Sequence, residues 1–186
     1  MVTQTLRRLF TVSEYHQMMD SGILREDDRV ELIEGEVIEM SPIGSRHAAC
    51  VKRLNRWLSE RVGRRAIVGV QDPVRLGERS EPQPDLALLR PRPDFYVQAH
   101  PEPQDIFLVV EVAETSADYD REVKVPLYAR AGLVEVWLVD IAARVIEVYR
   151  QPGPTGYRQM QRLSPGQQLS SAVWPDVSLP VDEILG

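Results

Sequence analysis

The spacing of apolar positions predicts a short helix and then a β-hairpin in the first quarter of the chain. Thr11 and Glu14 stand three residues apart, as in a capping box, ahead of an apolar helical stretch that stops near Gly22. Residues 30–33 and 36–40 then alternate apolar and polar side chains on either side of a two-residue turn. The turn contains a glycine, which favours a hairpin.

The rest of the chain alternates between the two periodicities. Residues 45–62 carry apolar side chains at helical spacing, and residues 116–130 read as a second long helix that Pro126 perturbs early. We expect strands or strand pieces at 66–70, 74–76, 85–89, 106–110, 134–139, 145–149 and after residue 156, a proline-rich surface loop at 91–103, and a short final helix within 179–185. This order predicts a mixed α/β (α+β) fold, a mixed sheet with helices on its faces, in a single domain spanning residues 1–186.

Composition narrows the class of protein. The chain has 186 residues, 43% of them hydrophobic, and a net charge of −6, which argues against broad non-specific binding of nucleic acid. Cys50 is the single cysteine, so no disulfide can form within the chain and a reducing compartment fits. The first ten residues lack the apolar core of a signal peptide, and no stretch is long and apolar enough to span a bilayer. We expect a cytoplasmic protein with no membrane segment.

Three separated residues suggest chemistry. Asp85 opens one buried-looking strand, Glu111 closes another, and Lys124 follows on the predicted helix. Removing a lone carboxylate from water costs several kcal/mol or forces it to take up a proton, and a divalent cation between two such acids would relieve that cost. Two carboxylates, a cation and an ammonium together suit metal-assisted hydrolysis of a phosphodiester.

Lysine is rare in this chain. Of the 22 basic residues only Lys52 and Lys124 are lysines, and a bias toward arginine accounts for most of that. Such a bias leaves lysine chiefly where the wide guanidinium of arginine fails, for example beside a water on a metal.

Several ordered motifs resemble the Uma2 family, which consists of restriction-endonuclease-like proteins within the PD-(D/E)xK nuclease superfamily. The resemblance runs from about residue 30 to residue 149. It is carried by the run from Val30 to Pro42 with Arg46-His47 after it, by Pro84-Asp85-Leu86-Ala87, by Val110-Glu111-Val112, by Lys124 with Tyr128 to Gly132, and by Glu135 to Asp140.

The resemblance implies a restriction-endonuclease-like core that holds Mg²⁺, or Mn²⁺, at one end of a mixed sheet. Asp85 and Glu111 match the two acids of the motif, and Glu31 resembles an earlier acid that joins the metal site. Lys124 matches the catalytic lysine, which in the common pattern would stand two residues after Glu111, where this chain has Ala113. His47 matches a histidine at the start of the second helix, where it could contact phosphate or carry a proton.

Each of these residues also has a purely structural reading. Asp85 could cap a turn after Pro84, Glu111 could be solvated or ion-paired, and Lys124 could lie on a helix surface. Glu31 belongs to an acidic hairpin, and His47 could simply begin a helix. The arginine-rich stretch 45–65 could follow a phosphate backbone, or it could pair with the acidic hairpin.

Two main functions remain open from the sequence. The first is a Mg²⁺-dependent endonuclease acting on DNA, working as a homodimer because cutting both strands needs two sites, with an apolar surface around Trp137 as the contact. The second is a catalytically inactive interaction module that keeps the fold. A metal-dependent hydrolase acting on RNA is a further alternative.

Overall fold

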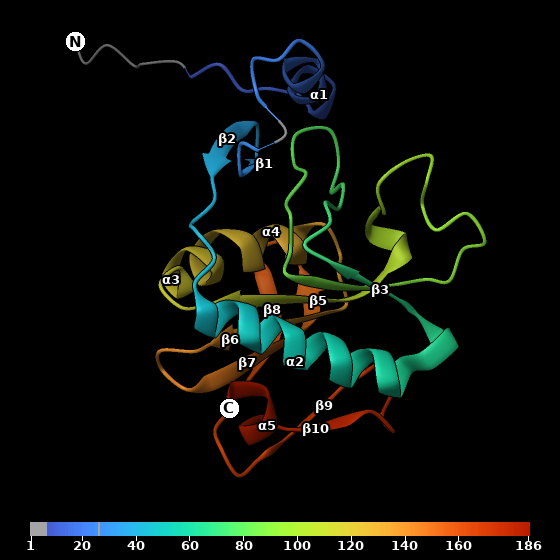
Figure 1. Ribbon diagram of the computed structural model, residues 1–186, viewed down its shortest axis with the longest axis vertical. Helices are drawn as coiled ribbons and strands as arrows, with labels where there is room; N and C mark the ends of the chain where they lie inside the picture. The colour runs from blue at the N-terminus through green and yellow to red at the C-terminus, as the bar shows by residue number, and fades with distance from the viewer. Residues whose placement is uncertain (1–6, 26) are drawn as a thin grey trace.

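The computed structural model describes residues 7–25 and 27–186, which form a central sheet with helices on both faces and an N-terminal layer at one end (Figure 1). The helices are α1 (Val12–Asp20), α2 (Ser45–Val62), α3 (Ala117–Tyr119), α4 (Val125–Arg130) and α5 (Val181–Leu185), with 3-10 turns η1 (Gly63–Arg65) and η2 (Pro103–Asp105) and a π-helical turn η3 (Asp120–Lys124). The strands are β1 (Val30–Ile33), β2 (Glu36–Glu39), β3 (Ile67–Val70), β4 (Leu86–Leu89), β5 (Ile106–Ala113), β6 (Glu135–Asp140), β7 (Val145–Gly153), β8 (Gly156–Leu163), β9 (Gln168–Ser170) and β10 (Ser178–Pro180).

The central sheet is mixed, as the sequence predicts. Its order is β3-β4-β5-β6-β7-β8, with β5 and β6 parallel and every other neighbouring pair antiparallel. The parallel pair needs a crossover, and the chain between residues 114 and 134 supplies it with α3, η3 and α4. Among the helices of the described residues, none is long and apolar enough to cross a membrane.

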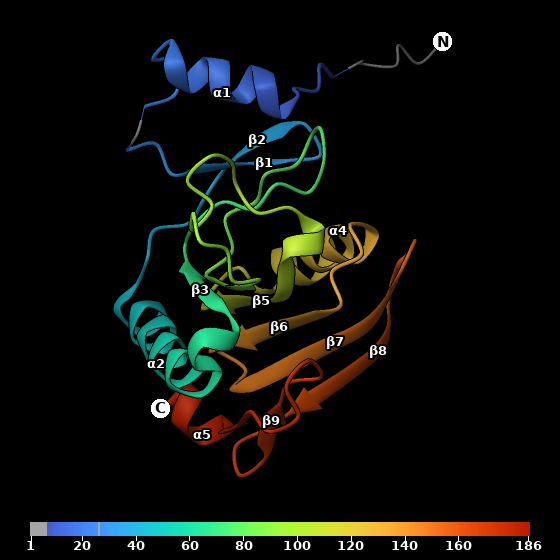
Figure 2. The same ribbon diagram turned by 90° about the vertical axis from the view of Figure 1, so that its right-hand side faces the viewer.

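Helices cover the two faces of this sheet with separate cores (Figure 2). Successive side chains of a strand point to opposite faces, and in β4 Leu86 and Leu88 join the core under α2 while Ala87 and Leu89 join the core under α4. These strands are therefore buried on both sides, which explains why they read as continuous apolar runs.

Helix α1 and the hairpin β1–β2 form the N-terminal layer (Figure 2). The predicted capping box is present, with the Thr11 side chain accepting a hydrogen bond from Glu14 N and Glu14 accepting one from Thr11 N. Tyr15 packs with Leu32 of β1 in a small core, and its hydroxyl donates to Val30 O at 3.0 Å. Helix α1 thus holds the hairpin β1–β2 in place through these contacts.

The chain is helical from Ala117 to Arg130, as predicted, and the perturbation expected from Pro126 takes the form of a π-helical turn. The chain forms three pieces, and in the middle one Val125 N donates to Asp120 O, five residues back, as in a π-helix. Pro126 explains this break because it has no N–H to donate to Glu122 in a regular α-helix. The wide turn buries both Asp120 and Lys124.

The predicted strand piece at 74–76 is wrong. Val74 N and Leu76 N donate to Pro82 O and Ser80 O, but the facing segment contains Pro82 and Pro84, which cannot donate in return, so no ladder forms.

The two acidic strands differ from the prediction by a few residues. Asp85 lies just before β4, and β5 continues to Ala113, so Glu111 lies inside the strand. Since Leu86 is paired with Val110 in antiparallel register, Asp85 stands beside Glu111.

The end of the chain packs against α2. Strands β9 and β10 pair, and α5 contributes Ile184 and Leu185 to the same core as α2. Trp137 is fully buried in this core, so the apolar surface that the sequence suggested for a dimer contact is not on the outside of the chain. The homodimer itself stays a prediction, without that argument.

Candidate active site

All five candidate residues line one cleft of about 390 Å³. Its walls come from the hairpin, the segment before β4, β5, the start of α2 and the turn η3. Acidic side chains outnumber basic ones among its lining residues, with Glu31, Glu39, Asp85, Glu111, Glu114 and Asp120 against Arg29 and Lys124. An excess of negative charge around a partly enclosed volume is costly without a cation.

Lys124 joins two of the acids. Its Nζ lies 2.9 Å from Glu111 Oε1 and 3.1 Å from Glu31 Oε2, and all three side chains are at most 5% exposed. Glu31 Oε2 also accepts a hydrogen bond from Gln83 N at 3.0 Å, and Tyr128 donates to Glu111 Oε1. Neither the surface reading of Lys124 nor the solvated reading of Glu31 and Glu111 therefore holds.

Burial dominates the ionisation of this cluster. The pKa of Glu111 is raised to about 8: burial is the largest cause, Lys124 opposes it, and the neighbouring Asp120, Asp85 and Glu31 add to it. Burial alone would lower the pKa of Lys124, but the surrounding carboxylates of Glu111, Glu31 and Asp120 together outweigh it, so the net direction is upward. The ammonium of Lys124 is held charged, and burial makes the ionised form of Glu111 costly without a further cation.

Asp85 and His47 form a second pair in the cleft. His47 Nε2 lies 3.0 Å from Asp85 Oδ2, which also accepts from Val112 N at 2.9 Å, while Asp85 Oδ1 accepts from Gln71 Nε2 at 3.1 Å. The hydrogen bond to Asp85 raises the pKa of His47, and burial offsets this only in part. His47 Nδ1 is buried without a partner among the residues that the structure describes.

Sequence reasoning missed further residues of the cleft. Asp120 is buried, accepts a hydrogen bond from Ser116 Oγ at 2.9 Å, and has its pKa raised, chiefly by burial. Asp120, Lys124 and Tyr128 recur every four residues, which places them on one helical face, so their spacing was the available signal. The two glutamines that hold Asp85 and Glu31 gave no comparable signal.

The arginine-rich helix α2 does not pair with the acidic hairpin in the way that one reading expected. Arg53 donates to Ile184 O and Leu185 O, Arg61 donates to Ser178 O and stacks on Trp57, and Arg65 pairs with Asp176. These guanidinium groups serve the C-terminal segment, which leaves fewer of them for a phosphate backbone.

The donor set of the cleft fits a hard divalent cation. Carboxylate oxygens are the protein ligands that Mg²⁺ prefers, and Glu31, Asp85 and Glu111 offer them from three different segments, with Asp120 as a fourth. Within the part of the chain that the structure describes, Asp85 Oδ1 accepts one hydrogen bond, so one of its lone pairs remains available. The roles of these acids as metal ligands stay predictions.

Comparison with known proteins gives a consistent result. The model of the Uma2 family, described as "Putative restriction endonuclease", matches residues 12–182. A crystal structure described as a putative nuclease belonging to DUF820, from Anabaena variabilis, superimposes with a TM-score of 0.76 at 16% identity, over 95% of this chain and 97% of that one. At that identity the likeness shows a shared fold. No curated protein matched the chain.

Proposed function

This chain belongs to the Uma2 family, and we propose that its cleft hydrolyses DNA phosphodiester bonds with the help of Mg²⁺, or of Mn²⁺ in its place. The observation that carries the proposal is the convergence of Glu31, Asp85 and Glu111 with one buried lysine in a single cleft. The family description and the fold of the structural neighbour support the class of reaction.

The three acids would hold the cation. When bound, Mg²⁺ supplies Lewis-acid polarisation of the phosphate and lowers the pKa of a coordinated water. The bound cation would also offset the desolvation cost of the buried acids, because it would pair with their negative charge.

The side chains around the acids have separate tasks. Lys124 places an ammonium where negative charge develops on the phosphate, and it donates hydrogen bonds without changing its own charge. Tyr128 and Gln83 hold Glu111 and Glu31 in position through the hydrogen bonds already described. His47, kept in place by Asp85, can donate to a phosphate oxygen or carry a proton near neutral pH.

The test combines metal binding and cleavage. We expect calorimetry to detect Mg²⁺ or Mn²⁺ binding to the wild type and supercoiled plasmid to be nicked, and we expect both signals to vanish in Asp85→Asn/Glu111→Gln. Asp118→Asn is the control, since it removes a carboxylate outside the cleft, on a side chain that is 92% exposed. A wild type that is folded but binds neither cation would overturn the proposal.

One observation favours a second candidate, a catalytically inactive interaction module. Lys124 already forms ion pairs with two of the acids, and such internal pairs can hold a fold together without any metal. This candidate predicts no cation binding and no nicking in the wild type. Comparison of plasmid with a single-stranded RNA of similar length separates DNA cleavage from the RNA alternative.

A further inference from the structure

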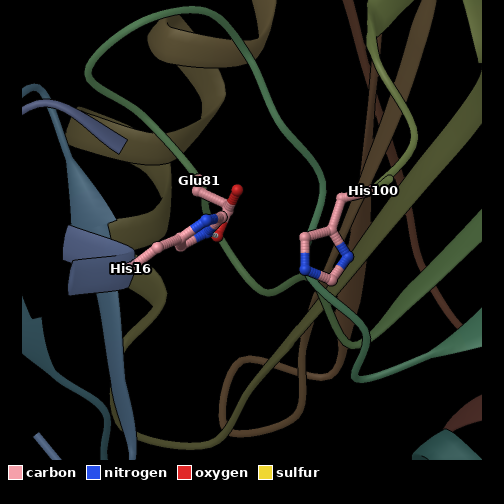
Figure 3. A group of neighbouring side chains, drawn as sticks. All are labelled: His16, Glu81 and His100. Carbon is pink, nitrogen blue, oxygen red and sulfur yellow. Dashed lines mark hydrogen bonds and ion pairs between the residues drawn. The ribbon is translucent and has the colours of Figure 1, made fainter. Parts of the chain in front are cut away.

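Three side chains outside the cleft come together from three separate segments (Figure 3). They are His16 of α1, Glu81 of the segment that leads to β4, and His100 of the proline-rich loop. One ligand atom from each lies within 4.8 Å of the others, and His16 Nε2 is 2.7 Å from Glu81 Oε1. Within the described residues, this is the one group of histidine and acidic side chains that meets this spacing.

Backbone hydrogen bonds fix the segments that carry these residues. Glu81 forms an antiparallel bridge with Leu32 of β1, in which Glu81 N donates to Leu32 O at 2.8 Å. Val12 N of α1 donates to Glu78 O at 2.7 Å, and Arg75 N donates to Pro101 O, next to His100, at 2.8 Å. The meeting of the three side chains is thus built into the fold.

Glu81 has an incomplete set of partners. Its side chain is 3% exposed, and Oε2 is buried with no hydrogen-bond partner among the described residues, while Oε1 has only His16. A buried carboxylate with one oxygen unmatched is costly. The two histidines lie nearer to solvent, with the side chain of His16 45% exposed and His100 exposed, so a small ion can reach the carboxylate.

We propose that His16, Glu81 and His100 form a second metal site, for a transition-metal cation of the Zn²⁺ type. Two imidazoles and a carboxylate are a common ligand set for Zn²⁺, with water in the remaining position, whereas Mg²⁺ prefers oxygen ligands throughout. Tetrahedral bonds of about 2.0–2.1 Å require ligand atoms roughly 3.4 Å apart. The exposed His100 can move inward to reach that spacing.

A cation here would brace the active-site cleft from behind. Glu81 precedes Asp85 by four residues, and between them Gln83 N holds Glu31. The metal would tie α1 and the proline-rich loop to this segment. Metal binding at this site does not depend on the proposed nuclease activity, so the two proposals can fail separately.

The chain offers matched variants, because it has three histidines and the third, His47, lies in the cleft. Untagged protein stripped with a chelator would be titrated with Zn²⁺ against a chromophoric chelator, and with Co²⁺ as a spectroscopic probe of the ligands. We expect the wild type to bind one equivalent of Zn²⁺. The affinity should fall tenfold or more in His16→Gln and in His100→Gln, because loss of a ligand should cost at least as much as loss of a residue that only hydrogen-bonds a ligand. Both His47→Gln and Asp85→Asn/Glu111→Gln should keep it.

Each alternative gives a different result. If His16 and Glu81 form only an ion pair, the wild type will bind no Zn²⁺. If Zn²⁺ binds in the cleft, His47→Gln or the double variant will lose it and His100→Gln will not. Either result overturns the proposal. His100 is exposed, so we expect His100→Gln to stay folded and a loss of binding in it to report the metal site.

Discussion

Lys124 is the residue on which the buried charges of the cleft depend. Replacing it with methionine leaves Glu31 and Glu111 without their ammonium, and breaking a buried pair from one side costs about 3–5 kcal/mol. We expect Lys124→Met to lower the free energy of unfolding by that amount in urea denaturation with a chelator present. Lys52, the only other lysine, is exposed, and Lys52→Met should change it by no more than about 0.5 kcal/mol. A loss below about 1 kcal/mol for Lys124→Met would show that Glu111 is neutralised by a proton instead.

His47 should make stability depend on pH. Because its pKa is raised in the folded state above the unfolded value of about 6.5, its pairing with Asp85 stabilises the fold fully below that pH and loses its effect as the pH rises through the folded pKa. The difference in unfolding free energy between wild type and His47→Gln should therefore be larger at pH 5.5 than at pH 8.5, measured without metal. A difference that does not change with pH would contradict the pairing.

At the scale of the element, Arg121 attaches the π-helical turn to the sheet. Its guanidinium pairs with Glu147 of β7 at 3.0 and 3.2 Å, and Glu147 is only 4% exposed. Arg121→Met should cost about 2 kcal/mol of unfolding free energy, less than for a fully buried pair because the arginine is one-third exposed. Arg56, whose pair with Glu60 lies on the surface, is the control, and Arg56→Met should cost under about 0.5 kcal/mol. Equal losses of unfolding free energy in both variants would show that the pair of Arg121 with Glu147 stabilises the fold no more than a surface ion pair does.

The same element shows where sequence reasoning succeeds and where it stops. The pattern of residues was enough to place Lys124 on a helix. Its grouping with the acids came from the resemblance to the Uma2 family and not from periodicity. Helical spacing could not predict the π-helical turn. The position of the extra residue depends both on the missing N–H of Pro126 and on which side chains pack against the sheet. Nor could helical spacing predict the contact of Lys124 with Glu31, 93 positions earlier, since such pairings follow from tertiary packing. The prediction of an apolar dimer surface around Trp137 was wrong for a related reason. The sequence pattern of a strand is the same whether its apolar side chains face the core of the chain or a partner.

At the scale of the whole molecule, charge limits how the protein could hold the DNA that we propose as its substrate. The chain carries a net charge of −6, and two arginines of α2 and Arg65 of η1 are engaged by its own C-terminal segment. If about two basic side chains contact phosphates, affinity for a 20-bp duplex should fall only about tenfold between 50 and 200 mM salt, against 10³ or more for six to ten contacts. Fluorescence anisotropy with Asp85→Asn/Glu111→Gln, which should not cut, measures the slope. A steep slope would mean that a basic surface forms on assembly.

The reactivity of Cys50 can report motion of α2, the helix whose start forms one wall of the cleft. Cys50 is the only cysteine, it is fully buried on α2, and burial raises the pKa of its thiol to about 11, so a disulfide reagent meets neither an exposed nor an ionised sulfur. Labelling must wait until α2 lifts from the sheet, and His47 lies on the same helix, three residues away. The rate of thiol exchange should therefore report how fast this wall of the cleft opens, and it can be read with an ordinary absorbance assay without introducing any mutation. A ligand that closes the cleft would be seen to slow it.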